Sequence, residues 1–90
     1  MKFSILIPCY NEFTNLKSLI DYILPLQDIY ELEYILVENG STDNSREYFQ
    51  NNIDGKYKNI KIAYVDTNKG YGFGIQQGLK LCKGEYLGWI

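Results

Sequence analysis

Residues 34–43 read YILVENGSTD, and this stretch governs how the rest of the chain is interpreted. Its first half, Tyr34 to Val37, is an unbroken apolar and aromatic run, which is typical of a strand buried on both faces of a parallel sheet. Its second half, Glu38 to Asp43, is made of polar and turn-forming residues that favour a turn followed by the start of a helix. The stretch therefore predicts a buried strand with polar side chains at its carboxyl end.

The same succession of strand, polar turn and helix recurs on both sides of this stretch. Strands are predicted at residues 3–8, 34–37, 60–65 and 86–90, and helices at residues 14–24, 44–51 and 73–82. Such alternation implies parallel strands joined by right-handed crossovers. We predict an α/β fold, a Rossmann-like open parallel sheet of about four strands with three flanking helices.

Several residues are expected to mark the ends of these elements. Pro8 should end the first strand, because proline cannot donate a hydrogen bond to a sheet. Thr14 or Asn11 should cap the first helix, and Pro25 should end it. The pair Lys83-Gly84 should end the third helix, since a basic residue followed by glycine is common at helix carboxyl ends.

Composition limits the chain to one small globular unit. It has 90 residues, of which 46% are hydrophobic and 16% aromatic, and its net charge is −2. The absence of a basic excess argues against a nucleic-acid module and against a polybasic membrane patch. No apolar run approaches the ~20 residues that span a bilayer, and the N-terminal run is too short for a signal peptide.

The two cysteines, Cys9 and Cys82, lie far apart in a chain without histidine. They cannot assemble the four ligands of a structural zinc site, and both fall in apolar stretches where a reduced, buried thiol is expected. Reduced thiols favour the cytoplasm, and we expect the full-length protein there or at the cytoplasmic face of a membrane.

Polar clusters follow three of the predicted strands, at residues 8–12, 38–41 and 66–70. In open α/β sheets, ligands bind beyond the carboxyl ends of the strands. A nucleoside diphosphate placed there needs a flat surface for its base, which Tyr10 can supply, and a polar partner for the edge of the base, which Glu38 or Asn39 can supply.

The remaining parts of such a ligand also find partners in these clusters. Ribose hydroxyls are bound by carboxylates, and Glu12 or Glu38 is available. A pyrophosphate is bound by cations and backbone amides, which Lys69 and the glycine-rich turn beginning at Gly70 can provide.

Each cluster also has a simple structural explanation. Tyr10 alone is a surface aromatic, Lys69 alone is a solvated charge, and residues 38–43 alone are an ordinary turn and helix cap. Glycines at positions 70, 72 and 74 follow GxGxG, so the dinucleotide-binding spacing GxGxxG is absent. It is the placement of all three clusters at one predicted sheet edge that favours ligand binding.

Four segments of the chain resemble motifs of family 2 glycosyltransferases, which have the GT-A fold. Residues 4–12 (SILIPCYNE) resemble the opening "VIPxYNE", and residues 34–43 resemble "IVVDDGSTD". Residues 68–72 (NKGYG) resemble "NxGxG", and residues 84–90 (GEYLGWI) resemble "GDYIxxLDAD" short of its acidic end. The four motifs follow in the family order over nearly the whole chain.

This resemblance implies a donor nucleotide pocket lined by Pro8, Tyr10 and Glu12. It also implies that Glu38 or Asn39 contacts the base or ribose; these two stand where the family usually has two aspartates. The donor would be a UDP- or GDP-linked sugar, and the reaction would transfer a glycosyl group to an unknown acceptor in glycan or polysaccharide synthesis.

The resemblance further implies that Lys69 and Gly70 lie near the phosphates. In such enzymes an Asp-x-Asp cluster binds a divalent cation, Mg²⁺ or Mn²⁺, and that cluster is expected directly after Ile90. The general base and acceptor site also lie further on. Residues 1–90 are thus expected to be an incomplete domain, the N-terminal nucleotide-sugar-binding segment, with no catalytic residue or metal ligand of its own and no activity alone.

The alternative is a non-catalytic α/β module, either a degenerate scaffold of glycosyltransferase-like fold or a receiver-like or flavodoxin-like domain. A receiver should carry paired carboxylates after its first strand, where this chain has Pro8-Cys9-Tyr10, although Asp66 does follow the third strand. In either case, an exposed edge on the fourth strand predicts a tendency to self-associate.

Overall fold

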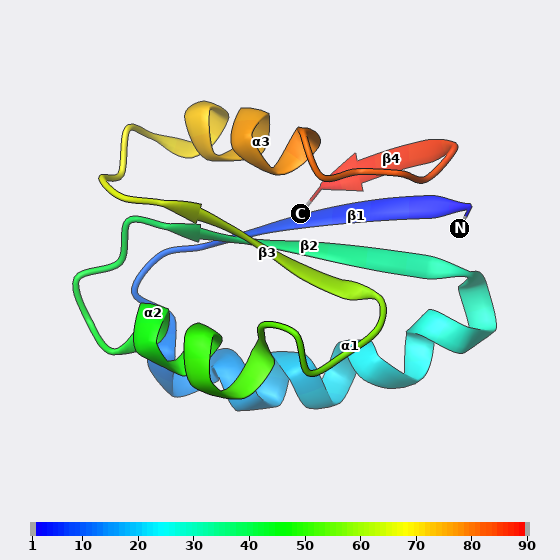
Figure 1. The fold of residues 1–90 in the computed structure, drawn as a ribbon, viewed down its shortest axis with the longest axis horizontal. Helices are drawn as coiled ribbons and strands as arrows, with labels where there is room; N and C mark the ends of the chain where they lie inside the picture. The colour runs from blue at the N-terminus through cyan, green and yellow to red at the C-terminus, as the bar shows by residue number, and fades with distance from the viewer. Residues whose placement is uncertain (1, 90) are drawn as a thin grey trace.

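The computed structural model describes residues 2–89, apart from the side chain of Asp28. Four parallel strands form one sheet in the order β3-β2-β1-β4 (Figure 1). The strands are β1 (Phe3–Cys9), β2 (Leu32–Asn39), β3 (Ile60–Val65) and β4 (Tyr86–Trp89). The predicted fold class is confirmed, and the strand predicted at residues 60–65 has the same bounds in the structure.

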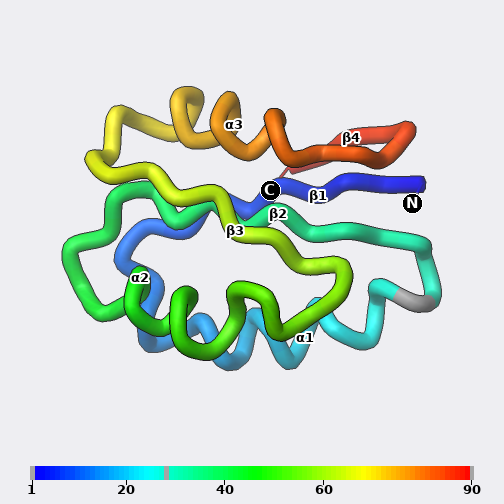
Figure 2. Tube along the Cα trace, in the orientation of Figure 1, coloured from blue at the N-terminus to red at the C-terminus, as the bar shows by residue number. Residues whose placement is uncertain are grey.

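Helices cover both faces of this sheet. They are a 3₁₀ turn η1 (Phe13–Asn15), α1 (Leu16–Tyr30), α2 (Ser45–Tyr48), the π-helical turn η2 (Phe49–Ile53) and α3 (Tyr71–Leu79). Figures 1 and 2 show α1 and α2 on one side of the sheet and α3 on the other. The chain is therefore a three-layer α/β arrangement.

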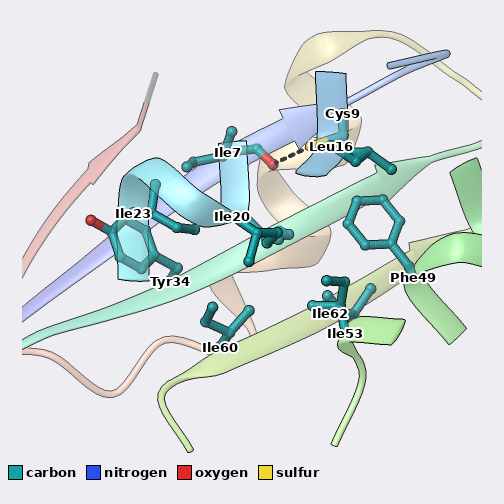
Figure 3. Close-up of a cluster of buried hydrophobic side chains, with 11 residues drawn as sticks. Ile7, Cys9, Leu16, Ile20, Ile23, Tyr34, Phe49, Ile53, Ile60 and Ile62 are labelled. Carbon is teal, nitrogen blue, oxygen red and sulfur yellow. Dashed lines mark hydrogen bonds between the residues drawn. The ribbon is translucent and has the colours of Figure 1, made fainter. Parts of the chain in front are cut away.

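The core is divided by the sheet into two apolar clusters. On the α1 side, Leu16 and Ile20 of α1 pack with Phe49 of η2 and with strand residues such as Ile62 (Figure 3). On the α3 side, five strand residues pack against Ile75. Because successive side chains of a strand point to opposite faces, β2 serves both clusters and is buried along almost its whole length.

The strand order reverses beside β1. The chain moves from β1 to β2 to β3 in one direction and then places β4 on the other side of β1. Ligands of open α/β sheets bind at such a reversal, beyond the carboxyl ends of the strands. Within residues 2–89, no helix combines the length and apolar character that crossing a bilayer requires.

Two expectations for α1 were wrong. Pro25 lies inside α1, which continues to Tyr30 and ends at Glu31 in a left-handed conformation, φ 54°. Pro25 faces solvent, while Leu24 beside it packs against the core, so apolar packing offsets the single helical hydrogen bond that proline removes. At the start of the helix, Asn15 holds the cap position after η1, so neither Thr14 nor Asn11 caps it.

Two further boundaries differ from the prediction. Pro8 lies within β1, and it is tolerated there because β4 pairs with β1 only as far as Leu6, leaving that edge of β1 without a described strand. α3 ends at Leu79, before Lys83-Gly84. Gly84 lies instead against β1, where a Cβ atom would come within 2.6 Å of the Ser4 backbone nitrogen.

Candidate functional site

The loops that follow β1 and β2 are joined by one asparagine. Asn11 adopts a left-handed conformation (φ 52°), which asparagine tolerates better than most residues. Its Oδ1 accepts hydrogen bonds from the backbone of Thr42 (2.8 Å) and Asp43 (3.3 Å), and its own N–H donates to Ser41 Oγ (3.0 Å). The first two polar clusters therefore form one hydrogen-bonded unit at the carboxyl edge of the sheet.

The buried side chain of Glu38 also supports this hydrogen-bonded unit. Its side chain is fully buried on the α2 side, where Oε1 accepts a hydrogen bond from the Ser41 backbone (2.9 Å). Arg46 Nη1 lies 3.9 Å from Oε2, and Arg46 Nη2 pairs with Asp66 at 2.9 Å. In this arrangement the carboxylate stabilises the turn and connects it to α2 and to the end of β3.

Asn39 points to the other face of the sheet. It is 3% exposed, and its Nδ2 donates to Gly70 O at 3.4 Å. Gly74 lies so close that an added Cβ would come within 2.9 Å of Asn39 Nδ2. Asn39 Oδ1 is buried and has no hydrogen-bond partner in the described residues, which is unusual for a buried polar atom. Glu38 Oε2 is likewise buried without a hydrogen-bond partner, but Arg46 Nη1 lies 3.9 Å from it, whereas no cation is recorded beside Asn39 Oδ1 in the described residues.

The third cluster is arranged around Gly70, just before α3. Gly70 has φ 102°, its N–H donates to Asn68 Oδ1 (2.7 Å), and its carbonyl accepts from Gly74 (3.3 Å). Lys69 is exposed, and its ammonium lies 5.1 Å from the ring centre of Phe73. The Gly70 N–H is already bonded, and Lys69 is the one cation among residues 66–70.

Pro8 and Glu12 share a hollow of about 240 Å³ on the α1 side of the first loop. Glu12 Oε2 accepts a hydrogen bond from Asn15 (3.0 Å), and the ring of Tyr10 is 46% exposed. Burial, with a smaller contribution from the nearby carboxylates, raises the pKa of Cys9 in this hollow to about 12. Cys9 and Cys82 are both free; Cys9 is buried, as expected, whereas Cys82 is only partly buried.

The structure brings the predicted residues to one edge of the sheet but not into one hollow. Tyr10 follows β1, Glu38 is the second-last residue of β2, and Lys69 lies in the loop after β3. Lys69, however, lines a separate hollow of about 250 Å³ beside β3 and α3, and Glu38 is enclosed. Asn11, which joins the loops, was missed as a site residue. The sequence feature that could have identified Asn11 is its place in the loop between the first strand and the first helix, a helix that it does not cap.

The described residues do not supply a metal site. Within residues 2–89, no three or more His, Cys, Asp or Glu side chains gather in a way that could hold a metal ion. The divalent cation implied by the family resemblance therefore does not fit these residues.

Comparison with known proteins supports the resemblance seen in the sequence. A glycosyltransferase of Haemophilus influenzae, described as uncharacterized, is 36% identical over 87 residues, which is 97% of this chain and 34% of that protein. The undecaprenyl-phosphate 4-deoxy-4-formamido-L-arabinose transferase of Pseudomonas fluorescens is 33% identical over 86 residues, 93% of this chain and 25% of that protein. The chain thus spans about a third or less of the length of these relatives.

Solved structures show the same likeness in three dimensions. The crystal structure of S. aureus TarS 1–349 in complex with UDP-GlcNAc superposes with a TM-score of 0.73 at 30% identity, covering 100% of this chain and 26% of that one. The family model of glycosyl transferase family 2 matches residues 4–90. The chain belongs to glycosyl transferase family 2.

Proposed function

We propose that residues 1–90 are the donor-binding segment of an enzyme that transfers a glycosyl group from a nucleoside-diphosphate sugar to an acceptor. The observation that carries this proposal is the buried, unpaired Oδ1 of Asn39 at the carboxyl end of β2. A buried acceptor costs free energy unless a donor reaches it, and the edges of uracil and guanine both offer N–H donors.

The other predicted residues take roles around this atom. Tyr10, whose ring is exposed, would stack on the base, and Glu12 would accept from the ribose hydroxyls. Lys69, with Gly70 shaping the turn, would pair with the pyrophosphate. Glu38 would act indirectly, by fixing the turn at Ser41. The S. aureus protein crystallised with UDP-GlcNAc supports a UDP-linked donor for this chain.

The remaining parts of the proposal concern the longer protein. Mg²⁺ or Mn²⁺ would be held by residues outside the described range and would offset negative charge on the departing nucleotide. The two reduced thiols support a cytoplasmic location, at a membrane face or away from it.

Calorimetric titration of UDP and GDP into the full chain tests the proposal. Asn39→Ala should weaken binding of the preferred nucleotide about three- to tenfold, the effect of one hydrogen bond. Asn59→Ala is the matched control, because Asn59 Oδ1 is also buried and unpaired but lies at the amino end of β3. Asn59→Ala should leave nucleotide binding unchanged.

Two results would contradict the proposal. If neither nucleotide binds at millimolar concentration, the chain is better explained as a non-catalytic scaffold of the same fold. If Asn39→Ala and Asn59→Ala weaken binding equally, the effect is one of stability, and Asn39 is not the contact.

A further inference from the structure

A third hollow opens between η1 and the α2–η2 segment, away from the residues proposed to bind the donor nucleotide. Its volume is about 270 Å³, and it is lined by Phe13, Asn44, Glu47, Tyr48, Asn51 and Asn52. We name it the Phe13 cleft. It includes none of the residues to which the donor nucleotide is assigned, and it is smaller than the ~300–1,000 Å³ of sites for drug-sized ligands.

Two aromatic rings form a corner of the Phe13 cleft. The rings of Phe13 and Tyr48 lie 6.0 Å apart between centres, at an interplanar angle of 81°. Phe13 is 40% exposed, yet it is held in place, because its backbone N–H donates to Asp43 Oδ2 at 3.3 Å. The corner thus offers aromatic surface that is partly accessible to solvent, on a residue whose backbone is held by Asp43.

Polar side chains with unused bonding capacity line the same cleft. Asn44, Glu47 and Asn51 are exposed, and their side chains make no hydrogen bond to another described residue. Only Asn52 is engaged, through Nδ2 and the Tyr48 carbonyl at 3.3 Å. Two amides and a carboxylate therefore remain available as donors and acceptors next to the aromatic corner.

The backbone that carries two of these residues is unusual. Asn51 and Asn52 lie on the π-helical turn η2, in which the Asp54 N–H donates to the Phe49 carbonyl at 2.8 Å. π-helical turns are rare and frequently occur at functional sites. The fully buried side chains of Phe49 and Ile53 anchor this turn in the core, so the core holds the turn that carries the two asparagines at the cleft.

Charge narrows the class of ligand. Glu47 is the single charged residue in the lining, and Arg46 on the same helix is paired with Asp66. A phosphate or nucleotide would be repelled by Glu47 and would find no cation in the lining. The chemistry suits a neutral molecule with an apolar face and a rim of hydroxyl groups.

We propose that the Phe13 cleft binds a single neutral sugar ring, with its apolar face on Phe13 and its hydroxyls bonded to Asn44, Glu47 and Asn51. This site lies beyond the proposed donor site and does not depend on nucleotide binding. It would hold a sugar unit of an acceptor or product chain rather than the nucleotide of the donor.

Saturation-transfer difference NMR on the full chain tests this proposal, with methyl β-D-glucopyranoside and methyl N-acetyl-β-D-glucosaminide as probes. At least one probe should bind saturably in the millimolar range. Phe13→Leu, which removes the ring face but keeps an apolar side chain, and Asn51→Ala should each weaken binding about three- to tenfold. Gln50→Ala is the matched control, because Gln50 is exposed on the same turn and does not line the cleft.

The outcomes separate this site from the donor site. Added UDP should leave the sugar signal unchanged; displacement by UDP would place the sugar in the donor pocket and overturn the proposal. Absence of saturable binding by both probes, or an equal loss in Gln50→Ala and Asn51→Ala, would also overturn it. Lysine methyl ester serves as a cationic probe, and tighter binding of that probe than of either glycoside would also overturn the proposal, because the cleft would then select cations through Glu47.

Discussion

Replacing Glu33 by glutamine should destabilise the fold, because this buried carboxylate joins three parts of the sheet. Glu33 lies near the start of β2 and has no exposed surface. Its Oε2 accepts hydrogen bonds from Ser4 Oγ of β1 (2.5 Å) and from the Lys83 backbone before β4 (2.6 Å). Its Oε1 lies 3.0 Å from Lys61 Nζ of β3.

The size of the effect follows from these contacts. A hydrogen bond to a charged group contributes about 1.5–3 kcal/mol and a neutral one about half as much, so glutamine forfeits roughly 1 kcal/mol at each of two bonds. The Lys61 pair adds less than ~1 kcal/mol, since that side chain is 29% exposed and screened by solvent. Glutamine is neutral, so burying it costs less free energy than burying a carboxylate, and this offsets part of the loss. We expect Glu33→Gln to lower the free energy of unfolding by about 2 kcal/mol. This is a large share of the ~5–13 kcal/mol that is typical for a domain of this length.

The loss should depend on pH in a definite direction. Burial by itself would raise the pKa of Glu33, but the bonds from Ser4 and Lys83 and the Lys61 ammonium outweigh it and hold the pKa below its ordinary value. A lowered folded-state pKa contributes stability above the unfolded value of ~4.3 and loses it as pH falls through the folded value. The difference in the free energy of unfolding between wild type and Glu33→Gln should therefore be largest at pH 7 and should shrink as the pH falls into the acid range.

Urea denaturation followed by far-UV circular dichroism, at pH 7 and at steps down through the acid range, measures both effects. Glu85→Gln provides the control, since Glu85 is an exposed glutamate close to the same loop. Its free energy of unfolding should stay within ~0.5 kcal/mol of wild type. The reasoning is refuted if Glu33→Gln loses less than ~0.5 kcal/mol, or if its loss is the same at every pH.

Two other predictions concern the carboxyl edge of the sheet. Gly40→Ala should cost at least ~3 kcal/mol in urea denaturation, because Gly40 has φ 70° and a Cβ there would lie 2.3 Å from the Asn68 backbone nitrogen. Gly55→Ala, at φ 75° with no neighbour within 4 Å, should cost only ~1–2 kcal/mol, and equal losses would argue against the clash. Cys9 should resist iodoacetamide at pH 8 until the chain is unfolded, since burial raises its pKa to about 12; mass spectrometry showing rapid alkylation in the native state would contradict its enclosure.

The sequence predicted the element types well because the apolar runs are bounded by polar turns, but β2, predicted at residues 34–37, runs from Leu32 to Asn39. It could not decide whether Glu38 or Asn39 faces a ligand. A strand buried on both faces has no alternation of apolar and polar residues, so the run through Val37 does not reveal which side chain points to which helix layer. In the structure, Glu38 lies on the α2 side of the sheet and Asn39 lies beneath α3.

Pro25 illustrates the opposite limit, where a local rule is overridden by packing. Proline ends most helices, but the partly buried Leu24 packs against the core and the helix continues past Pro25. Likewise, Lys69 follows β3 as predicted, yet its ammonium lies near the Phe73 ring beside α3. Which hollow a long side chain enters depends on neighbours that sequence spacing does not specify.

The bonds of Asn11 to Ser41, Thr42 and Asp43 have a consequence for engineering the nucleotide edge. If only the loop after β1 were replaced by a loop from another protein, it would no longer match the loop after β2. The hydrogen bonds that Asn11 makes to residues 41–43 would then be lost. Exchanging both loops together would transfer the connection intact. If these loops bind the nucleotide as proposed, a change of base preference requires residues 10–13 and 40–43 to be exchanged together, with Asn11 retained.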